Sequence, residues 1–172
     1  IQMLTVNKNV LAAVAIAAAG FAGAASADTA VADFQVKITI QKACKVTAGI
    51  GAADIDFGTV PGLQATDAIA NNLNKLSVLC SKSVPYDIGL LPSNGNTAGA
   101  GVMSGTDSIP YQLRSVSGTG AAWGNVVGTN TVHSTGTGIA QPYTVYASVL
   151  AANLNVTPGA YLDNKVTVTV TY

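Results

Sequence analysis

Strict alternation of apolar and polar residues near both ends of the chain limits its folding more than any other feature. In the first stretch, ADTAVADFQVKITIQKAC at residues 27–44, six apolar side chains fall on one side of an extended chain: Ala30, Ala32, Phe34, Val36, Ile38 and Ile40. The other side is mostly polar. This two-residue period is typical of a half-buried strand. Such a strand would be roughly 36 Å long at ~3.3 Å per residue, whereas ordinary strands span ~17–20 Å.

The last stretch, KVTVTVTY at residues 165–172, alternates in the same way. One face carries Val166, Val168, Val170 and Tyr172, and the other carries threonines. We expect this run, like the first, to be an edge strand. Long apolar edges pair readily with another chain, so a protein with two of them either aggregates or uses them for assembly.

Between these ends, short alternating runs indicate strands, and nothing after residue 27 indicates a helix. The predicted strands are 34–46, 54–60, 73–80, 86–91, 109–115, 143–149 and 165–172. Clusters rich in Gly, Ser, Thr and Asn predict turns at 92–101, 117–125 and 128–138, and a Pro-Gly turn lies within 155–161. Many short strands at this spacing favour a single antiparallel β-sandwich domain.

The first 27 residues have the pattern of a secretory signal peptide. Lys8 is their only charged residue, 10–22 is an apolar, Ala-rich run, and Ala25-Ser26-Ala27 is a small-x-small cleavage site. We expect cleavage after Ala27, which leaves residues 28–172 as one exported domain. The alternative is a membrane anchor, which the shortness of the run and its Ala and Gly content disfavour.

Charge is sparse in this chain. Asp, Glu, Lys and Arg make up 9% of it, there is no Glu, and residues 28–172 carry a net charge of −1. An average domain has ~25% charged residues. The absence of a basic patch argues against nucleic acid as a partner. A weakly charged surface suits a protein that packs against copies of itself.

The two cysteines, Cys44 and Cys80, predict one disulfide in an exported protein. A zinc site would need further ligands, and His133 is the only histidine in the chain. The loop that the disulfide closes is long enough to stabilise the fold by ~4 kcal/mol in the chain-entropy model.

No group of residues indicates catalysis, a metal or a cofactor. A single histidine in a polar stretch is more often solvated than catalytic. Asp54 and Asp56 share one face of a predicted strand, where a calcium site or a glycosidase pair is an alternative to a turn or a solvated edge. The Gly-rich stretches lack the lysine and the helix of a phosphate-binding loop. Trp123 either stacks on a sugar or folds over the end of the sandwich. We therefore expect a protein that is not an enzyme.

An ordered set of residues across nearly all of 28–172 resembles the spore coat protein U domain family, which includes the pilins of archaic, Csu-type chaperone–usher pili. The matching positions are Cys44, Asp56-Phe57-Gly58, VLCSKSVPYDIGL with Cys80 and Tyr86, IPYQL at 109–113, Trp123-Gly124, Tyr146, and TPGAYLDNKVTVTVTY at the end. Two departures concern local packing: Ala147 stands where the family often has glycine, and Arg114 where it often has an aromatic residue.

The resemblance implies an immunoglobulin-like antiparallel sandwich that lacks its last strand. In such pilins a periplasmic chaperone lends a strand, and at the outer-membrane usher the N-terminal extension of the next subunit replaces it. On this reading 28–36 is the donor segment, with Ala30, Ala32, Phe34 and Val36 facing the groove of a neighbour. The following residues form the subunit's own first strand up to Cys44. The C-terminal strand, with Val166, Val168, Val170 and Tyr172, lines the acceptor groove and is also what the chaperone recognises.

The expected function is that of a major subunit of an extracellular pilus, assembled head to tail from copies of itself, for surface attachment and biofilm formation. Two alternatives remain open. One is a secreted monomeric sandwich that binds carbohydrate through Trp123, and the other is an amyloid-like or coat-forming protein.

Overall fold

The computed structural model describes residues 28–49, 51 and 53–172. The predicted signal peptide, 1–27, lies outside the described residues. The chain divides into two units, one up to Ile38 and one from Thr39 to Tyr172. In the described part of the first unit, residues 28–38, every residue is exposed and none belongs to a strand. The second unit contains all the strands described below.

The described residues form ten strands and a short 3₁₀-helix, η1 (Ala151–Asn153). The strands are β1 (Cys44–Thr47), β2 (Ala68–Asn71), β3 (Leu76–Cys80), β4 (Pro85–Pro92), β5 (Ala100–Ser104), β6 (Ser108–Arg114), β7 (Val132–Thr135), β8 (Gln141–Tyr143), β9 (Tyr146–Val149) and β10 (Val166–Thr171). Among these residues there is no helix with the length and hydropathy needed to span a bilayer. The predicted all-β fold class is confirmed.

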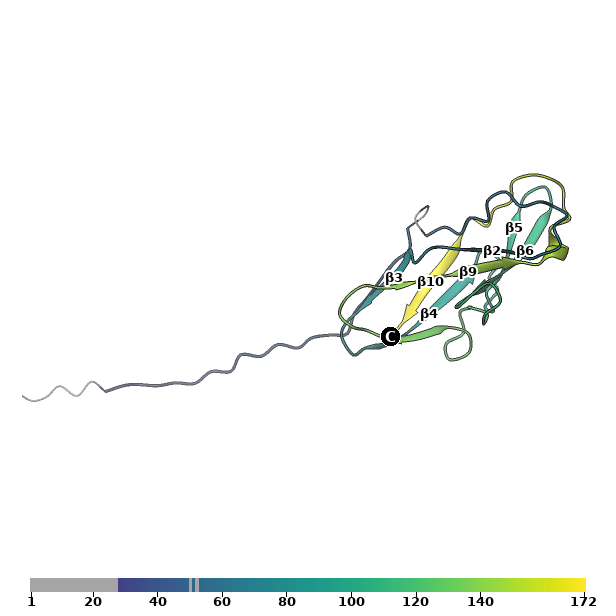
Figure 1. Cartoon of the computed structure of the whole chain (residues 1–172). Helices are drawn as coiled ribbons and strands as arrows, with labels where there is room; N and C mark the ends of the chain where they lie inside the picture. The colour runs from purple at the N-terminus through teal and green to yellow at the C-terminus, as the bar shows by residue number, and fades with distance from the viewer. Residues whose placement is uncertain (1–27, 50, 52) are drawn as a thin grey trace, which may run out of the picture. The chain divides into compact units, whose positions relative to one another are not determined.

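All strand pairs are antiparallel, in sheets with the orders β1-β3-β8, β10-β4-β7 and β2-β9-β6-β5. In Figure 1 the yellow β10 lies beside β4 and ends at the C-terminus. Inward side chains of β3, β4, β6 and β9 join one hydrophobic core, as expected for a β-sandwich. Since β10 is the last strand in its sheet order, one of its edges pairs with β4 and the other is unpaired among the described residues.

Trp123 links two of the sheets from inside the core, those that contain β4 and β6. Its side chain is 1% exposed, and its indole Nε1 donates a 2.7 Å hydrogen bond to the carbonyl oxygen of Ile88 on β4. Its backbone N–H donates to the carbonyl oxygen of Leu113 on β6. The next residue, Gly124, must be glycine, because a Cβ there would overlap the carbonyl oxygen of Thr97. Trp123 lies outside the strands, as predicted, but its side chain is buried in the core, which the sequence interpretation did not expect.

Several strand predictions were confirmed with shifted ends, and others were not. The runs at 73–80, 86–91, 109–115 and 165–172 correspond to β3, β4, β6 and β10. The run at 143–149 is interrupted, so that β8 ends at Tyr143 and β9 begins at Tyr146. No strand was predicted at β2, β5 or β7, which are short and rich in Ala, Gly, Ser and Thr. β7 lies inside the cluster 128–138, which was expected to be a turn.

The two strands predicted nearest the N-terminus, 34–46 and 54–60, are mostly not strands in the structure. Of the predicted strand 34–46, only β1 is a strand, starting at Cys44. The predicted strand 54–60 belongs to no sheet. A strand needs a partner to satisfy its backbone N–H and C=O groups, and no described strand pairs with 34–43 or with 54–60.

Candidate functional site: an apolar groove beside the C-terminal strand

A large cavity of about 1190 Å³ opens into the core of the second unit. Residues 53–60 form most of one wall, and 156–168, which includes the first half of β10, forms the other. Its floor consists of core side chains, chiefly Leu76, Leu90, Tyr111, Leu113, Ala147 and Val149. A cavity of this size in a hydrophobic core has room for several further apolar side chains. We call it the groove.

The first wall of the groove alternates without being a strand. Ile55 and Phe57 are partly buried against the core, while Asp54 and Asp56 point outward and are exposed. Asp56 Oδ1 accepts a 2.7 Å hydrogen bond from the backbone N–H of Gly58, which makes a local turn. The two carboxylates are therefore solvated, and one shapes a turn, as the simpler sequence interpretation expected.

The first half of β10 belongs to the second wall of the groove. Val168 and Val170 are partly buried against the core, and their threonine neighbours are exposed. Val166 and Val168 line the groove, Val166 is 38% exposed, and Tyr172 is 46% exposed. The alternation of KVTVTVTY thus places its valines toward the groove side of the sheet and its threonines toward solvent. Which of these residues contact a partner stays a prediction.

Polar contacts fasten the segment that leads into β10. The Tyr111 hydroxyl donates a 2.7 Å hydrogen bond to Asp163 Oδ2, and the Tyr111 ring lies against Gly101, where a Cβ would overlap it. Burial, together with this carboxylate, raises the pKa of Tyr111. Asp107 accepts hydrogen bonds from the backbone N–H of Thr157 and the hydroxyl of Tyr161. The side chain of Thr157, followed by its backbone N–H and by Tyr161, lowers the pKa of Asp107. This end of the groove is therefore fixed by side chains from the β5–β6 hairpin.

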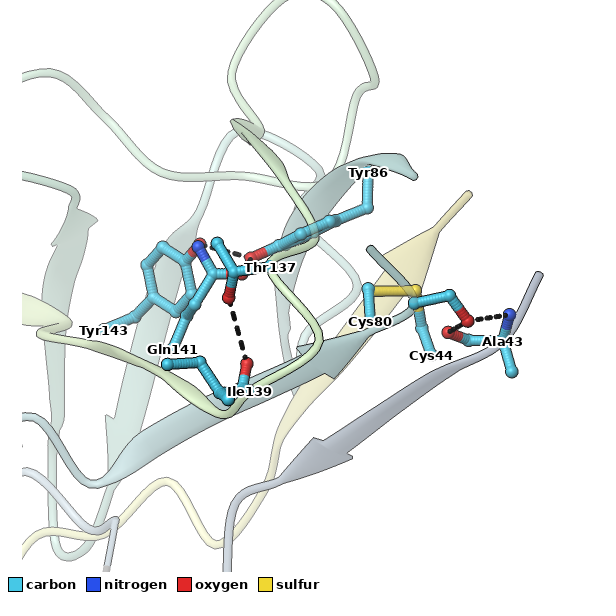
Figure 2. Close-up of a disulfide and its surroundings, with 9 residues drawn as sticks. Ala43, Cys44, Cys80, Tyr86, Thr137, Ile139, Gln141 and Tyr143 are labelled. Atoms are coloured by element: carbon cyan, nitrogen blue, oxygen red, sulfur yellow. Dashed lines mark hydrogen bonds between the residues drawn. A yellow bond between two sulfur atoms is a disulfide. The ribbon is translucent and has the colours of Figure 1, made fainter. Parts of the chain in front are cut away.

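The disulfide joins β1 to β3 beyond the groove. Cys44 and Cys80 are directly paired in the ladder, with a Cα–Cα distance of 4.1 Å, which confirms the predicted bond. Figure 2 shows it beside a cluster in which the Tyr86 hydroxyl contacts both Gln141 and Tyr143. Burial, and the hydrogen bond with Tyr86, raise the pKa of Tyr143 to about 12.

The base of the N-terminal extension and the C-terminus lie at the same pole of the sandwich. Lys42 Nζ lies 5.6 Å from the centre of the Tyr172 ring, within range of a cation–π contact. Lys42 comes two residues before Cys44, and Tyr172 follows β10 directly. The pole at the other end of β10 is the one fastened by Tyr111 and Asp163.

The residues of the predicted donor segment are all exposed, including Ala30 and Ala32. Phe34 and Val36 are 88% and 87% exposed, which is unusual for large apolar side chains. The structure gives them no partner among the described residues of this chain, and their role as a donor strand stays a prediction.

Two other candidate residues do not form a site. Burial of Trp123 excludes stacking of this side chain on a sugar in this structure. The His133 side chain, on β7, is 65% exposed, with Nδ1 3.4 Å from Asp87 Oδ2. The described residues contain no group of three or more His, Cys, Asp and Glu that could hold a metal ion. The sequence did not indicate the contact between Tyr111 and Asp163. Both residues belong to motifs that resemble the family, but the motifs are far apart in the sequence and do not show that these two side chains meet.

Comparison with known proteins supplies the family. Residues 30–171 match the family described as the Spore Coat Protein U domain. The chain belongs to this family. It is 32% identical to Protein U of Myxococcus xanthus over 178 aligned residues, which cover 96% of this chain and 98% of that protein.

A solved structure has a fold similar to that of this chain. It is the pre-assembly complex of the chaperone CsuC with the tip adhesion subunit CsuE, from archaic chaperone–usher Csu pili of Acinetobacter baumannii. The TM-score is 0.51 at 22% identity, and the match covers 78% of this chain. The chain spans 40% of the length of the solved chain that it matches. The family match agrees with the prediction that the chain is not an enzyme.

Proposed function

We propose that this protein is a structural subunit of a chaperone–usher surface pilus that polymerises by donor-strand exchange, with residues 1–27 as a cleaved signal peptide. The groove carries this proposal. Segment 53–60 and β10 each lack a strand partner on the groove side among the described residues, and core side chains line the cavity between them. An inserted strand would supply side chains to the cavity and backbone hydrogen bonds to β10.

The N-terminal extension has the chemistry of that strand. Phe34 and Val36 are exposed on one face of an alternating segment, and burial of each side chain would contribute ~1.5–3 kcal/mol. Each ladder hydrogen bond to β10 would add ~0.5–1.5 kcal/mol. Insertion into a neighbouring copy is β-strand addition, the mode in which main-chain pairing gives affinity and alternate side chains give specificity.

The positions of the two poles indicate the direction of the donor. Because Lys42 lies beside Tyr172, each subunit sends out its extension at the pole where β10 ends. A donor antiparallel to β10 leaves its acceptor at the opposite pole, near Val166, so that subunits add head to tail and the chain stays open. A parallel donor would leave at the Tyr172 pole and favour a closed pair that exchanges strands. We therefore expect the antiparallel arrangement.

The same groove implies two assembly partners. An empty apolar groove in a monomer is a site of aggregation, so a periplasmic chaperone must cover it before assembly. The structure with the shared fold is such a complex of a chaperone with a subunit of a pilus. The outer-membrane usher would then catalyse the exchange. The product is an extracellular filament made of this subunit, with a role in surface attachment and biofilm formation.

A denaturing gel tests this function. Filaments sheared from cells of the native organism should run, without boiling, as a ladder of subunit multiples, and boiling should collapse the ladder to one band. A secreted carbohydrate-binding monomer would run as one band in both samples. That outcome would overturn the proposal; the burial of Trp123 already removes the residue on which the carbohydrate alternative depended. A ladder that forms without any chaperone would indicate an amyloid-like or coat-forming protein instead.

A further inference from the structure

The apolar face of the N-terminal extension continues beyond the donor segment that the family resemblance suggested. Four large apolar residues follow one another at a spacing of two: Phe34, Val36, Ile38 and Ile40. Their exposed fractions are 88%, 87%, 83% and 76%. Ala30 and Ala32, on the same face, offer much less apolar surface. The apolar surface of the extension is therefore concentrated in 34–40.

Ile38 and Ile40 were expected to lie in the subunit's own first strand, and the structure places them elsewhere. The first strand, β1, begins only at Cys44, and residues 39–43 are exposed. No described strand pairs with any residue before Cys44. Because these two isoleucines are neither buried nor in a paired strand of their own subunit, their side chains are available to pack into the groove of another subunit.

The length of the sandwich limits how much of the extension fits. β4, the longest strand, has 8 residues, or about 26 Å, and β10 has 6. The complete alternating face, Ala30 to Ile40, would extend roughly 33 Å between its first and last residues. An inserted strand therefore places about four of the six apolar side chains in the groove. The register of the donor strand decides whether these four come from the Ala30 end or from the Ile40 end of the face.

We infer that the donor strand is centred on 34–40, with Phe34, Val36, Ile38 and Ile40 in the groove and Ala30 and Ala32 at or beyond its end. This inference rests on the proposed function. This register is favoured because it buries the most apolar surface in a groove whose floor is aliphatic and aromatic.

This register also shortens the connection between subunits. Only Gln41, Lys42 and Ala43 remain between the donor strand and the disulfide-bonded Cys44, a reach of about 10 Å when extended. A donor ending at Val36 would leave 37–43 as a linker of about 24 Å. The inferred register therefore predicts successive subunits in close contact, with the Lys42–Tyr172 pole of one against the groove end of the next.

Aspartate substitutions at the two ends of the face test the register in the full chain. Ile40→Asp should reduce the unboiled ladder roughly tenfold or more, as Phe34→Asp should, because each puts a charge into the groove. Ala30→Asp should leave the ladder unchanged. Thr39→Asp is the matched control on the opposite face. The amount of subunit with an intact Cys44–Cys80 bond, measured on a non-reducing gel of periplasm, reports folding and should be equal in all four.

Each other outcome overturns a defined part of this account. If Ala30→Asp abolishes the ladder and Ile40→Asp does not, the donor lies at 28–36 and the register is wrong. If Ile40→Asp lowers the amount of disulfide-bonded subunit while Thr39→Asp does not, Ile40 belongs to the subunit's own fold and the register is again wrong. If even Phe34→Asp keeps the full ladder, the proposed function itself fails.

Discussion

The Tyr111 hydroxyl donates a 2.7 Å hydrogen bond to the Asp163 carboxylate, and this contact ties β6 to the segment that leads into β10. Tyr111→Phe removes the bond and leaves the ring against Gly101. We expect the variant subunit to lose ~0.5–1.5 kcal/mol of stability at neutral pH, measured by urea unfolding. Tyr146 is a half-buried tyrosine on β9, and Tyr146→Phe serves as the comparison. It should lower the free energy of unfolding by less than Tyr111→Phe does.

The same tyrosine gives a dependence on alkaline pH. Since the pKa of Tyr111 is raised in the folded state, its stabilisation is complete below the unfolded pKa of ~10 and is lost as the pH rises above it. Each such tyrosine lowers the free energy of unfolding by up to ~1.4 kcal/mol per pH unit. Above pH ~10 the stability of Tyr111→Phe should therefore fall less steeply than that of the wild type. Parallel slopes would show that Tyr111 ionises as readily in the folded protein as in the unfolded chain.

The disulfide should contribute more than any single hydrogen bond. Its two cysteines are 36 residues apart, and closing such a loop stabilises a fold by ~4 kcal/mol in the chain-entropy model. The double variant Cys44→Ser with Cys80→Ser should therefore unfold at a much lower urea concentration and accumulate poorly in the periplasm. Unchanged urea midpoints would mean that the β1–β3 ladder holds without the bond.

Sequence patterns predicted the parts of this fold whose partners lie in the core. Ile88 and Leu113 are in predicted strands because each belongs to an alternating apolar run, and both are buried. β5 was missed because its inward residue is Gly101, which makes room for the Tyr111 ring and so carries no apolar signal. Trp123 gave no indication of its burial, because its neighbours are turn-forming and its partner, the Ile88 carbonyl, is 35 residues away.

The groove could be predicted only in part. The alternation ending at Tyr172 indicated an edge strand, and β10 is one. The alternation beginning at Ala30 indicated a strand, but the described chain supplies no partner for it. A two-residue period states which side chains share a face; it does not state whether the strand that covers that face belongs to the same molecule.

The donor segment should be sensitive on one face only. Phe34→Asp places a charge in an apolar groove, so filaments should fail while the disulfide-bonded monomer still accumulates. Gln35→Asp, the adjacent residue on the opposite face, should assemble normally. Electron microscopy of sheared filaments, with a periplasmic gel for the monomer, measures both. Normal filaments from Phe34→Asp would show that another segment is the donor.

The C-terminus should not tolerate extension. A short polar insertion directly after Tyr172 leaves the sandwich intact but places extra chain at the end of β10, the strand that the chaperone is expected to recognise. Such an insertion should abolish co-purification with the chaperone and piliation. The control is the same insertion between Val127 and Gly128, in the exposed turn at 126–129. The rest of the cluster 128–138 is unsuitable, because it contains β7. Equal capture of both forms would contradict a recognition role for this end.

Photo-crosslinking from position 34 tests donor-strand exchange most directly. A benzoylphenylalanine in place of Phe34 keeps the aromatic side chain, and filaments grown from a mixture of ¹⁵N-labelled and unlabelled subunits distinguish links between chains from links within one chain. Mass spectrometry should find mixed-label cross-links from position 34 to groove residues such as Leu90, Leu113 or Val168. Links confined to one chain, or links between chains at exposed sites away from the groove such as Ile69 and Val116, would contradict the account.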